Sequence, residues 1–182
     1  MTSSYDPQYA PAGDVGMALM VIDSRLKAIY DDKAGPGVEQ RLLTEQFVAS
    51  LDPGQADDLL DGACTLIYMF MTWLRKAHEE HGKDVIEYVV PNLVATMGTM
   101  HRSVPPEAIP TMAGLVIAAG TGLSPSLWRR QYGDWTDKEM NPLEATAILL
   151  AEHINRMTGD PAFATRLITE ALSRAEEDRP SV

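Results

Sequence analysis

The 182-residue chain contains a single cysteine, Cys64, so it cannot form an intramolecular disulfide framework. One cysteine fits a protein of a reducing compartment. Basic residues are also scarce: 15 Lys and Arg stand against 26 Asp and Glu, which gives a formal net charge of −11. Because proteins hold nucleic-acid phosphates with clustered Lys and Arg, this balance argues against sequence-independent nucleic-acid binding.

Long apolar runs are absent as well. The two longest, Leu66–Leu74 and Met112–Gly120, are far shorter than the roughly 20 residues that a membrane helix needs. Residues 1–13 lack the basic start and the apolar stretch of a secretory signal. We therefore expect no membrane association and a cytoplasmic protein.

Apolar residues recur at helical spacing along most of the chain, which predicts an all-α fold. We expect one irregular helical bundle of six or seven helices over residues 14–176, with a disordered arm at 1–13 and a frayed tail at 177–182. The predicted helices are 14–31, 38–51, 55–81, 84–102, 105–120, 141–159 and 161–175. Asp14 and Asn141 are predicted to cap the first and the sixth of them. Residues 85–90 are β-branched enough for a strand, but we favour helix because no partner strand is evident.

Two features predict that this chain self-associates. Residues 66–74 are apolar on every side of their predicted helix, so they must be buried in a bundle centre or in an oligomer interface. Gly114, Ala118 and Gly122 leave one side of another helix almost bare, which would allow a second helix to approach closely. We expect a homodimer or a larger assembly.

Asp57, Asp58 and Asp61 have the DDxxD spacing. The motif resembles the aspartate-rich motif of helical terpene synthases and prenyltransferases, and this resemblance implies a magnesium ion held on a diphosphate substrate. It covers five residues, and no second motif of this kind is present. The other interpretation is that these carboxylates complement the dipole at the start of a helix.

A variant of this hypothesis adds Asp84 and Glu87, which lie three residues apart and so share a helix face. Two acidic faces sharing magnesium would be similar to all-α nucleotide pyrophosphohydrolases. Solvated helix faces are the competing explanation.

Other side chains of metal-binding type give no ligand set. His78 and His81 are three residues apart rather than four. Met97, Met100 and His101 have the residue types of a copper(I) site, although methionines at helical spacing more often fill a core. We predict no metal and no cofactor, and Cys64 should be buried and inert.

Residues 128–135 stand out because they hold two tryptophans, a tyrosine and an arginine pair. The side chains are Trp128, Arg129, Arg130, Tyr132 and Trp135. They fall in a connection of about 20 residues, longer than compact domains normally use, and they are the residue types enriched at binding hot spots. We interpret them as a binding loop that contributes more to binding than to folding; the alternative is that the tryptophans cover the bundle end while the arginines pair with surplus acid.

The sequence therefore favours a non-enzymatic cytoplasmic protein that binds a protein partner or itself through residues 128–135. Two alternatives stay open. One is a metal-assisted enzyme acting on a phosphorylated or diphosphate substrate through Asp57, Asp58 and Asp61. The other is a small-molecule binder with an apolar, Met-rich pocket.

Overall fold

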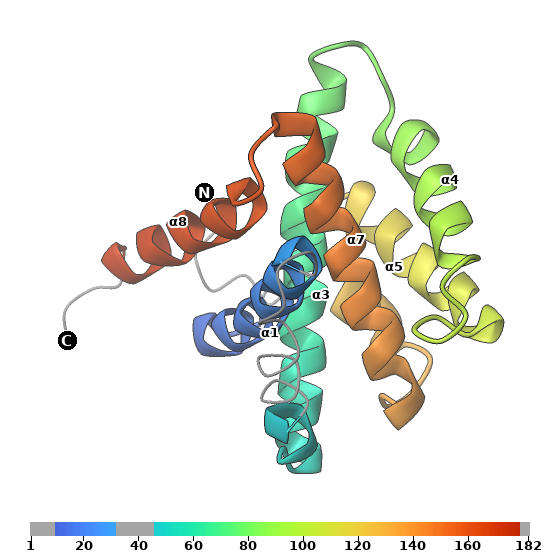
Figure 1. The fold of residues 1–182 in the computed structure, drawn as a ribbon, viewed down its shortest axis with the longest axis vertical. Helices are drawn as coiled ribbons and strands as arrows, with labels where there is room; N and C mark the ends of the chain where they lie inside the picture. The colour runs from blue at the N-terminus through green and yellow to red at the C-terminus, as the bar shows by residue number, and fades with distance from the viewer. Residues whose placement is uncertain (1–9, 32–45, 179–182) are drawn as a thin grey trace.

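The computed structural model describes residues 10–31 and 46–178, which form helices and no strand. The all-α prediction is confirmed (Figure 1). The α-helices are α1 (Ala12–Asp31), α3 (Pro53–Glu79), α4 (Val85–Met97), α5 (Ile109–Gly120), α6 (Pro125–Arg130), α7 (Met140–Thr158) and α8 (Phe163–Glu177). Two 3-10 helices, η1 (Pro106–Ala108) and η2 (Asp137–Glu139), precede α5 and α7, and residues 46–49 are also helical.

The longest helix, α3, runs through the middle of the bundle (Figure 1). A capping box between Asp52 and Gln55 starts it, with each side chain bonded to the other's backbone N–H. The helix contacts α1, α4, α5, α6, α7 and α8. These neighbours bury the middle of α3, where Leu66, Phe70 and Leu74 have no exposed surface. A single chain thus encloses most of this stretch, which matches the bundle-centre alternative, and this argument for self-association falls away.

Residues 85–90 are helical, as we favoured. Asp84 caps α4 by accepting the Ile86 N–H at 2.8 Å. The buried residues Val85, Val89, Leu93 and Met97 follow at intervals of four, so the β-branched stretch lies on the packed face of a helix. The helix passes through Pro91 without ending and stops at Met97, five residues before the predicted end.

Several predicted boundaries were wrong. α1 begins at Ala12, so Asp14 lies inside the helix and the last residues of the expected arm are helical. A capping box between Thr136 and Glu139 forms η2, from which α7 continues, so Asn141 is helical and caps nothing. Residues 1–9, most of the predicted helix at 38–51, and residues 179–182 lie outside the described part. Gly159, in the left-handed region at φ 68°, ends α7 where predicted.

Among the described residues, no helix is both long enough and apolar enough to cross a membrane.

The packing of α1 on α3 depends on Gly62. A Cβ atom at this position would lie 2.4 Å from the Asp14 carbonyl oxygen and 3.2 Å from the Ala18 Cβ. The first obstacle is backbone, which cannot rotate away. Only glycine allows the two helices to come this close.

We therefore expect Gly62→Ala to lower the free energy of unfolding by about 1–3 kcal/mol, as overpacked sites do. Gly16→Ala in α1 is the matched control, because a Cβ there meets nothing within 4 Å; it should raise stability by about 0.5–1 kcal/mol through helix propensity. Urea unfolding at neutral pH gives both values. Equal stability of the two variants would contradict the close contact.

Candidate functional site

The long connection between α5 and α7 is folded, in contrast to the expected loop. We call residues 124–139 the α6–η2 segment. Ser124 begins it as the cap of α6, with its hydroxyl accepting the Leu127 N–H at 3.2 Å, and Pro125 follows as the first helical residue. The segment packs on α5 and α3, which places the predicted binding residues against the centre of the bundle.

Arg129 is the buried hub of this segment, only 6% exposed. Its guanidinium forms two hydrogen bonds to the Glu139 carboxylate, the Nε bond measuring 2.6 Å. It also donates to the carbonyls of Gly133 at 2.9 Å and Asp134 at 3.0 Å. The Trp135 ring lies under it, with the guanidinium carbon 4.9 Å from the ring centroid. One side chain therefore ties α6, the following turn and η2 together.

Both partners of this pair are held in their charged forms. The hydrogen bonds that Arg129 donates to the Glu139 carboxylate raise the pKa of Arg129, although burial opposes this. Burial alone would raise the pKa of Glu139, but hydrogen bonds from Arg129 and from the Thr136 backbone and hydroxyl outweigh it and hold that pKa below the ordinary value. Two charges with this many partners form a satisfied buried network.

Asp61 fastens the segment to α3. Its carboxylate accepts the Ser126 hydroxyl at 2.5 Å, the Trp135 indole N–H at 3.3 Å and the guanidinium of Arg130. Asp61 is largely buried, whereas the side chain of Arg130 is 57% exposed. One member of the DDxxD motif thus anchors the segment that we singled out for binding.

Trp128 occupies the bare side of α5. A Cβ atom added to Gly114 would lie 2.3 Å from the Trp128 ring, so the indole is seated directly on the α5 backbone. The second argument for self-association is also weakened, because Trp128 of the same chain covers Gly114, Ala118 is buried, and Gly122 lies beyond the end of α5. Tyr132 packs on the outer side of Trp128 at 5.1 Å between ring centroids.

The five predicted binding residues therefore lie together, but they play unequal parts. Trp128 and Trp135 are half-buried against the core, so both contribute to folding. Arg129 is not an exposed binding side chain, because Glu139 pairs with it inside the structure, as in the alternative in which the arginines pair with surplus acid. Tyr132 is 69% exposed, which makes it the freest aromatic side chain of the set.

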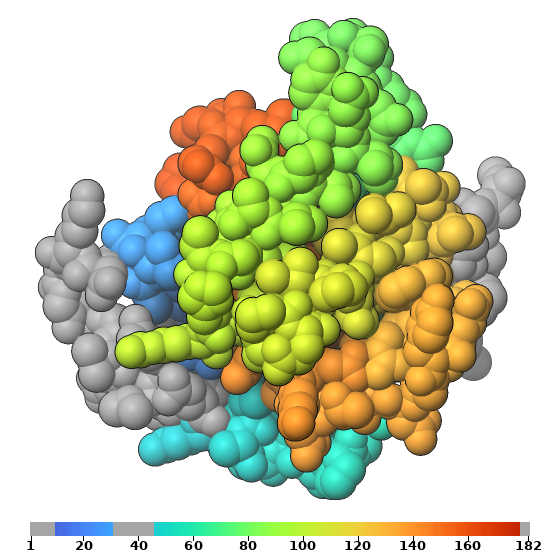
Figure 2. Space-filling view, turned by 90° about the vertical axis from the view of Figure 1, so that its right-hand side faces the viewer, coloured from blue at the N-terminus to red at the C-terminus, as the bar shows by residue number. Residues whose placement is uncertain are grey.

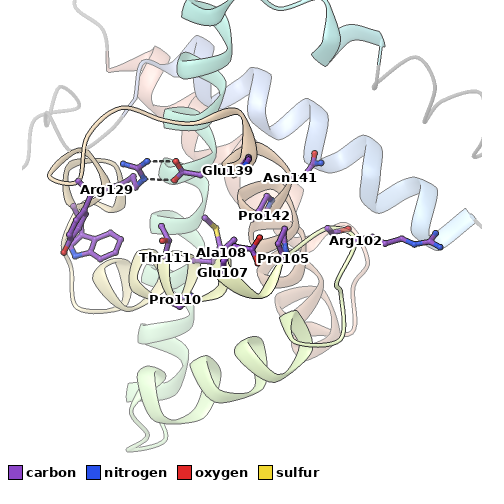
Figure 3. Close-up of a pocket in the computed structure, with 15 residues that line it drawn as sticks. Arg102, Pro105, Glu107, Ala108, Pro110, Thr111, Arg129, Glu139, Asn141 and Pro142 are labelled. Carbon is purple, nitrogen blue, oxygen red and sulfur yellow. Dashed lines mark hydrogen bonds and ion pairs between the residues drawn. The ribbon is translucent and has the colours of Figure 1, made fainter.

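A cleft of about 660 Å³ lies beside the segment, between η1, the start of α5, α6 and the start of α7. Figure 2 shows the face on which α4, α5 and the start of α7 come together. The lining is mostly apolar, with three prolines and two aromatic rings: Pro105, Pro110, Pro142, Trp128 and Tyr132. The Arg129–Glu139 pair stands at one end (Figure 3), and Glu107, Lys138 and Arg102 add charges.

Arg102 stands at the other end of this cleft. Figure 3 shows its side chain extending away from the remaining labelled residues. It also lines a second hollow of about 320 Å³, together with Ser103 and Asn141, which are shared by the two. The cleft and the second hollow therefore adjoin along these three residues.

The structure gives little support to a metal site. Asp57 and Asp58 are exposed near the start of α3, while Asp61 is occupied by the α6–η2 segment. Asp84 follows the far end of α3; the 18 helical steps from Asp61 to Glu79 alone span roughly 27 Å. The two acidic faces cannot share one magnesium ion, so that variant was wrong.

The other candidate ligands do not converge either. Met97 is fully buried, whereas His101 is exposed. The Nδ1 of His78 is hydrogen-bonded to the Leu74 carbonyl oxygen at 2.7 Å. No group of three or more His, Cys, Asp or Glu among residues 10–31 and 46–178 is placed to hold a metal ion. Cys64 is fully buried, and its burial raises the pKa of the thiol well above the usual range, as expected of an inert cysteine.

Comparison with known proteins adds no relative: no family model, no curated protein and no solved structure matches the chain.

Sequence reasoning missed Glu139 and Asp61 as partners of the segment. The Glu139 role was readable, because Thr136-x-x-Glu139 is a capping-box pattern. Asp61, 74 positions away from Trp135, gave no local signal. The cleft itself is lined by residues from 102 to 142, and only the fold brings them together.

The buried pair predicts unequal effects for two neighbouring arginines. Arg129→Met leaves Glu139 without its charged partner and should cost about 3–5 kcal/mol of stability. Arg130→Met removes a mostly exposed ion pair and should cost about 1 kcal/mol or less. Urea unfolding of the two variants makes the comparison. Similar losses in both would mean that Arg129 does not organise the segment.

Glu139 also predicts a pH dependence. Its folded pKa is lowered, so its contribution is present above the unfolded pKa of about 4.3 and is lost as the pH falls through the folded value. In the Glu139→Gln protein, the fall in unfolding free energy between pH 6 and pH 3 should be smaller than in the wild type. Urea titrations across this range measure it, and parallel pH profiles would refute the assignment.

Proposed function

We propose that this protein is a non-enzymatic cytoplasmic binding protein that recognises a protein partner through the α6–η2 segment and its cleft. The observation that carries the proposal is the division of the segment into a fixed inner side and an apolar outer side. Arg129 and Asp61 hold the inner side. Tyr132, Leu127 and Leu123, the residue before Ser124, are 69%, 44% and 58% exposed.

Exposed apolar side chains on a rigid support suit a protein interface. Single exposed leucines are ordinary, but here three large apolar side chains occur within ten residues, beside an apolar cleft. Aromatic and aliphatic anchors lose little conformational entropy on binding when their backbone is already fixed. The hydrogen bonds of Arg129 fix that backbone, so the segment is organised before a partner arrives.

Self-association through this same segment is the other form of this hypothesis. Of the two features that first suggested it, the middle of α3 is mostly buried within one chain, and Gly114 of the small-residue face is covered by Trp128. The enzyme hypothesis is weakened as well, because the Asp61 carboxylate is hydrogen-bonded to Ser126 and Arg130 of the segment.

A small-molecule ligand is the second candidate, and the size of the cleft favours it. Its volume of about 660 Å³ falls within the range of ligand pockets. The expected Met-rich lining is absent from the described part, however, since Met112 is the only methionine in this cleft.

The test compares matched exposed residues on and off the segment. Tyr132→Ala and Leu127→Ser should each weaken partner binding by about 2 kcal/mol or more, as hot-spot truncations do, while stability changes by about 1 kcal/mol or less. Tyr88→Ala on α4 and Met157→Ser on α7 are the controls, with native side chains 48% and 47% exposed. Each variant is immobilised and incubated with cell lysate, and quantitative mass spectrometry identifies the proteins that it retains. Calorimetry then measures the affinity of each variant for a retained partner.

Partners lost equally in the control variants, or retained in both segment variants, would contradict the proposed surface.

A further inference from the structure

The cleft combines an apolar lining with cations that pair with no described carboxylate, which is unusual in so acidic a molecule. Most Lys and Arg side chains in the described residues form ion pairs. Four do not pair with any described carboxylate: Lys76, Lys83, Arg102 and Lys138. Arg102 and Lys138 both line the cleft. Two of the four unpaired cations therefore belong to one surface.

The other charges of the cleft do not cancel this pair. Arg129 and Glu139 neutralise one another. Glu107 is exposed and is the one further carboxylate of the lining, so the cleft carries a net charge of about +1 in a chain whose net charge is −11. This local positive charge attracts an anionic ligand, whereas the net negative charge of the rest of the molecule repels it.

The shape of the surface favours an extended occupant. The cleft runs from Tyr132 and Trp128 at α6 to Arg102, where it adjoins the second hollow along Ser103 and Asn141. That hollow continues with apolar residues of α1 and α7, among them Ile29 and Ile148. A compact ligand would fill one hollow, whereas an extended peptide crosses both.

We propose that the segment of the protein partner bound in this cleft is an extended acidic peptide, with Asp or Glu side chains next to aromatic or large aliphatic ones. This inference rests on the proposed protein-binding function and adds the chemistry of the partner. The apolar side chains pack on Trp128, Tyr132 and the prolines. The carboxylates meet Lys138 and Arg102 and avoid Glu107.

The experiment selects peptides from a random 12-residue library displayed on phage, with the full chain immobilised. Enriched peptides are synthesised with a fluorescent label, and fluorescence anisotropy measures their affinity. We expect enrichment of Asp and Glu within a few positions of an aromatic or large aliphatic residue. Affinity should fall as ionic strength rises, because the charges are exposed.

Variants of opposite sign make the test specific. The double variant Arg102→Glu and Lys138→Glu should weaken binding of the selected peptides by about tenfold, while Glu107→Gln should strengthen it by about twofold, as expected from surface ion pairs. Damage to the fold would weaken binding in both variants, so opposite effects exclude it. Lys76→Glu, which reverses an unpaired cation outside the cleft, should change affinity much less.

Three results would overturn the inference: no enrichment at all, enrichment of neutral or basic peptides, or affinities that the charge variants do not change. Dimers in which a second copy fills the cleft would also overturn it, and sedimentation at the selection concentration detects them. If Tyr132→Ala abolishes partner binding while the charge variants have no effect, the proposed function stands and only the acidic chemistry fails. If Tyr132→Ala leaves partner binding intact, the proposed function itself fails.

Discussion

The α6–η2 segment depends on the hydrogen bonds of one buried group, the guanidinium of Arg129. A connection of this length has many backbone groups that need hydrogen-bond partners, and no neighbouring strand or long helix supplies them. Arg129 supplies two of these partners by donating to the carbonyls of Gly133 and Asp134, and Glu139 keeps it charged. Because Arg129 is buried and the Glu139 side chain is largely shielded from solvent, either charge alone would be unfavourable. The pair therefore holds two short helices and the turn between them as a defined surface.

Much of the fold could be read from the sequence, because helix periodicity is local. The central helix, its all-round apolar middle and the left-handed Gly159 all follow from nearby residues. Residues 85–90 show the same principle: their β-branched composition suggested a strand, but their apolar spacing decided for a helix. The errors at Asp14 and Asn141 were errors of position, since each is a good capping residue that lies inside its helix because a neighbouring residue begins the helix first.

The site was predictable only in part. The clustering of Trp, Tyr and Arg at 128–135 marked the right segment, because those residue types are unusual together in an acidic chain with few aromatics. The sequence does not show which of these side chains face inward, because Arg129 and Arg130 are adjacent residues of the same type. Their environments differ because each meets a different carboxylate. Arg129 pairs with Glu139, ten positions later in the chain, and Arg130 pairs with Asp61, 69 positions earlier. The cleft likewise depends on the way α5 and α7 are brought together.

The contact between Trp128 and Gly114 joins the shape of the segment to the backbone of α5. The Trp128 indole can lie this close to the α5 backbone only because residue 114 has no side chain, and the indole fills the space that the missing side chain leaves. The two residues therefore depend on one another. In descendants of this chain, a change at one of the two positions should be followed by a change at the other: a larger residue at 114 should accompany a smaller one at 128. The two positions, 14 residues apart, should evolve as one unit.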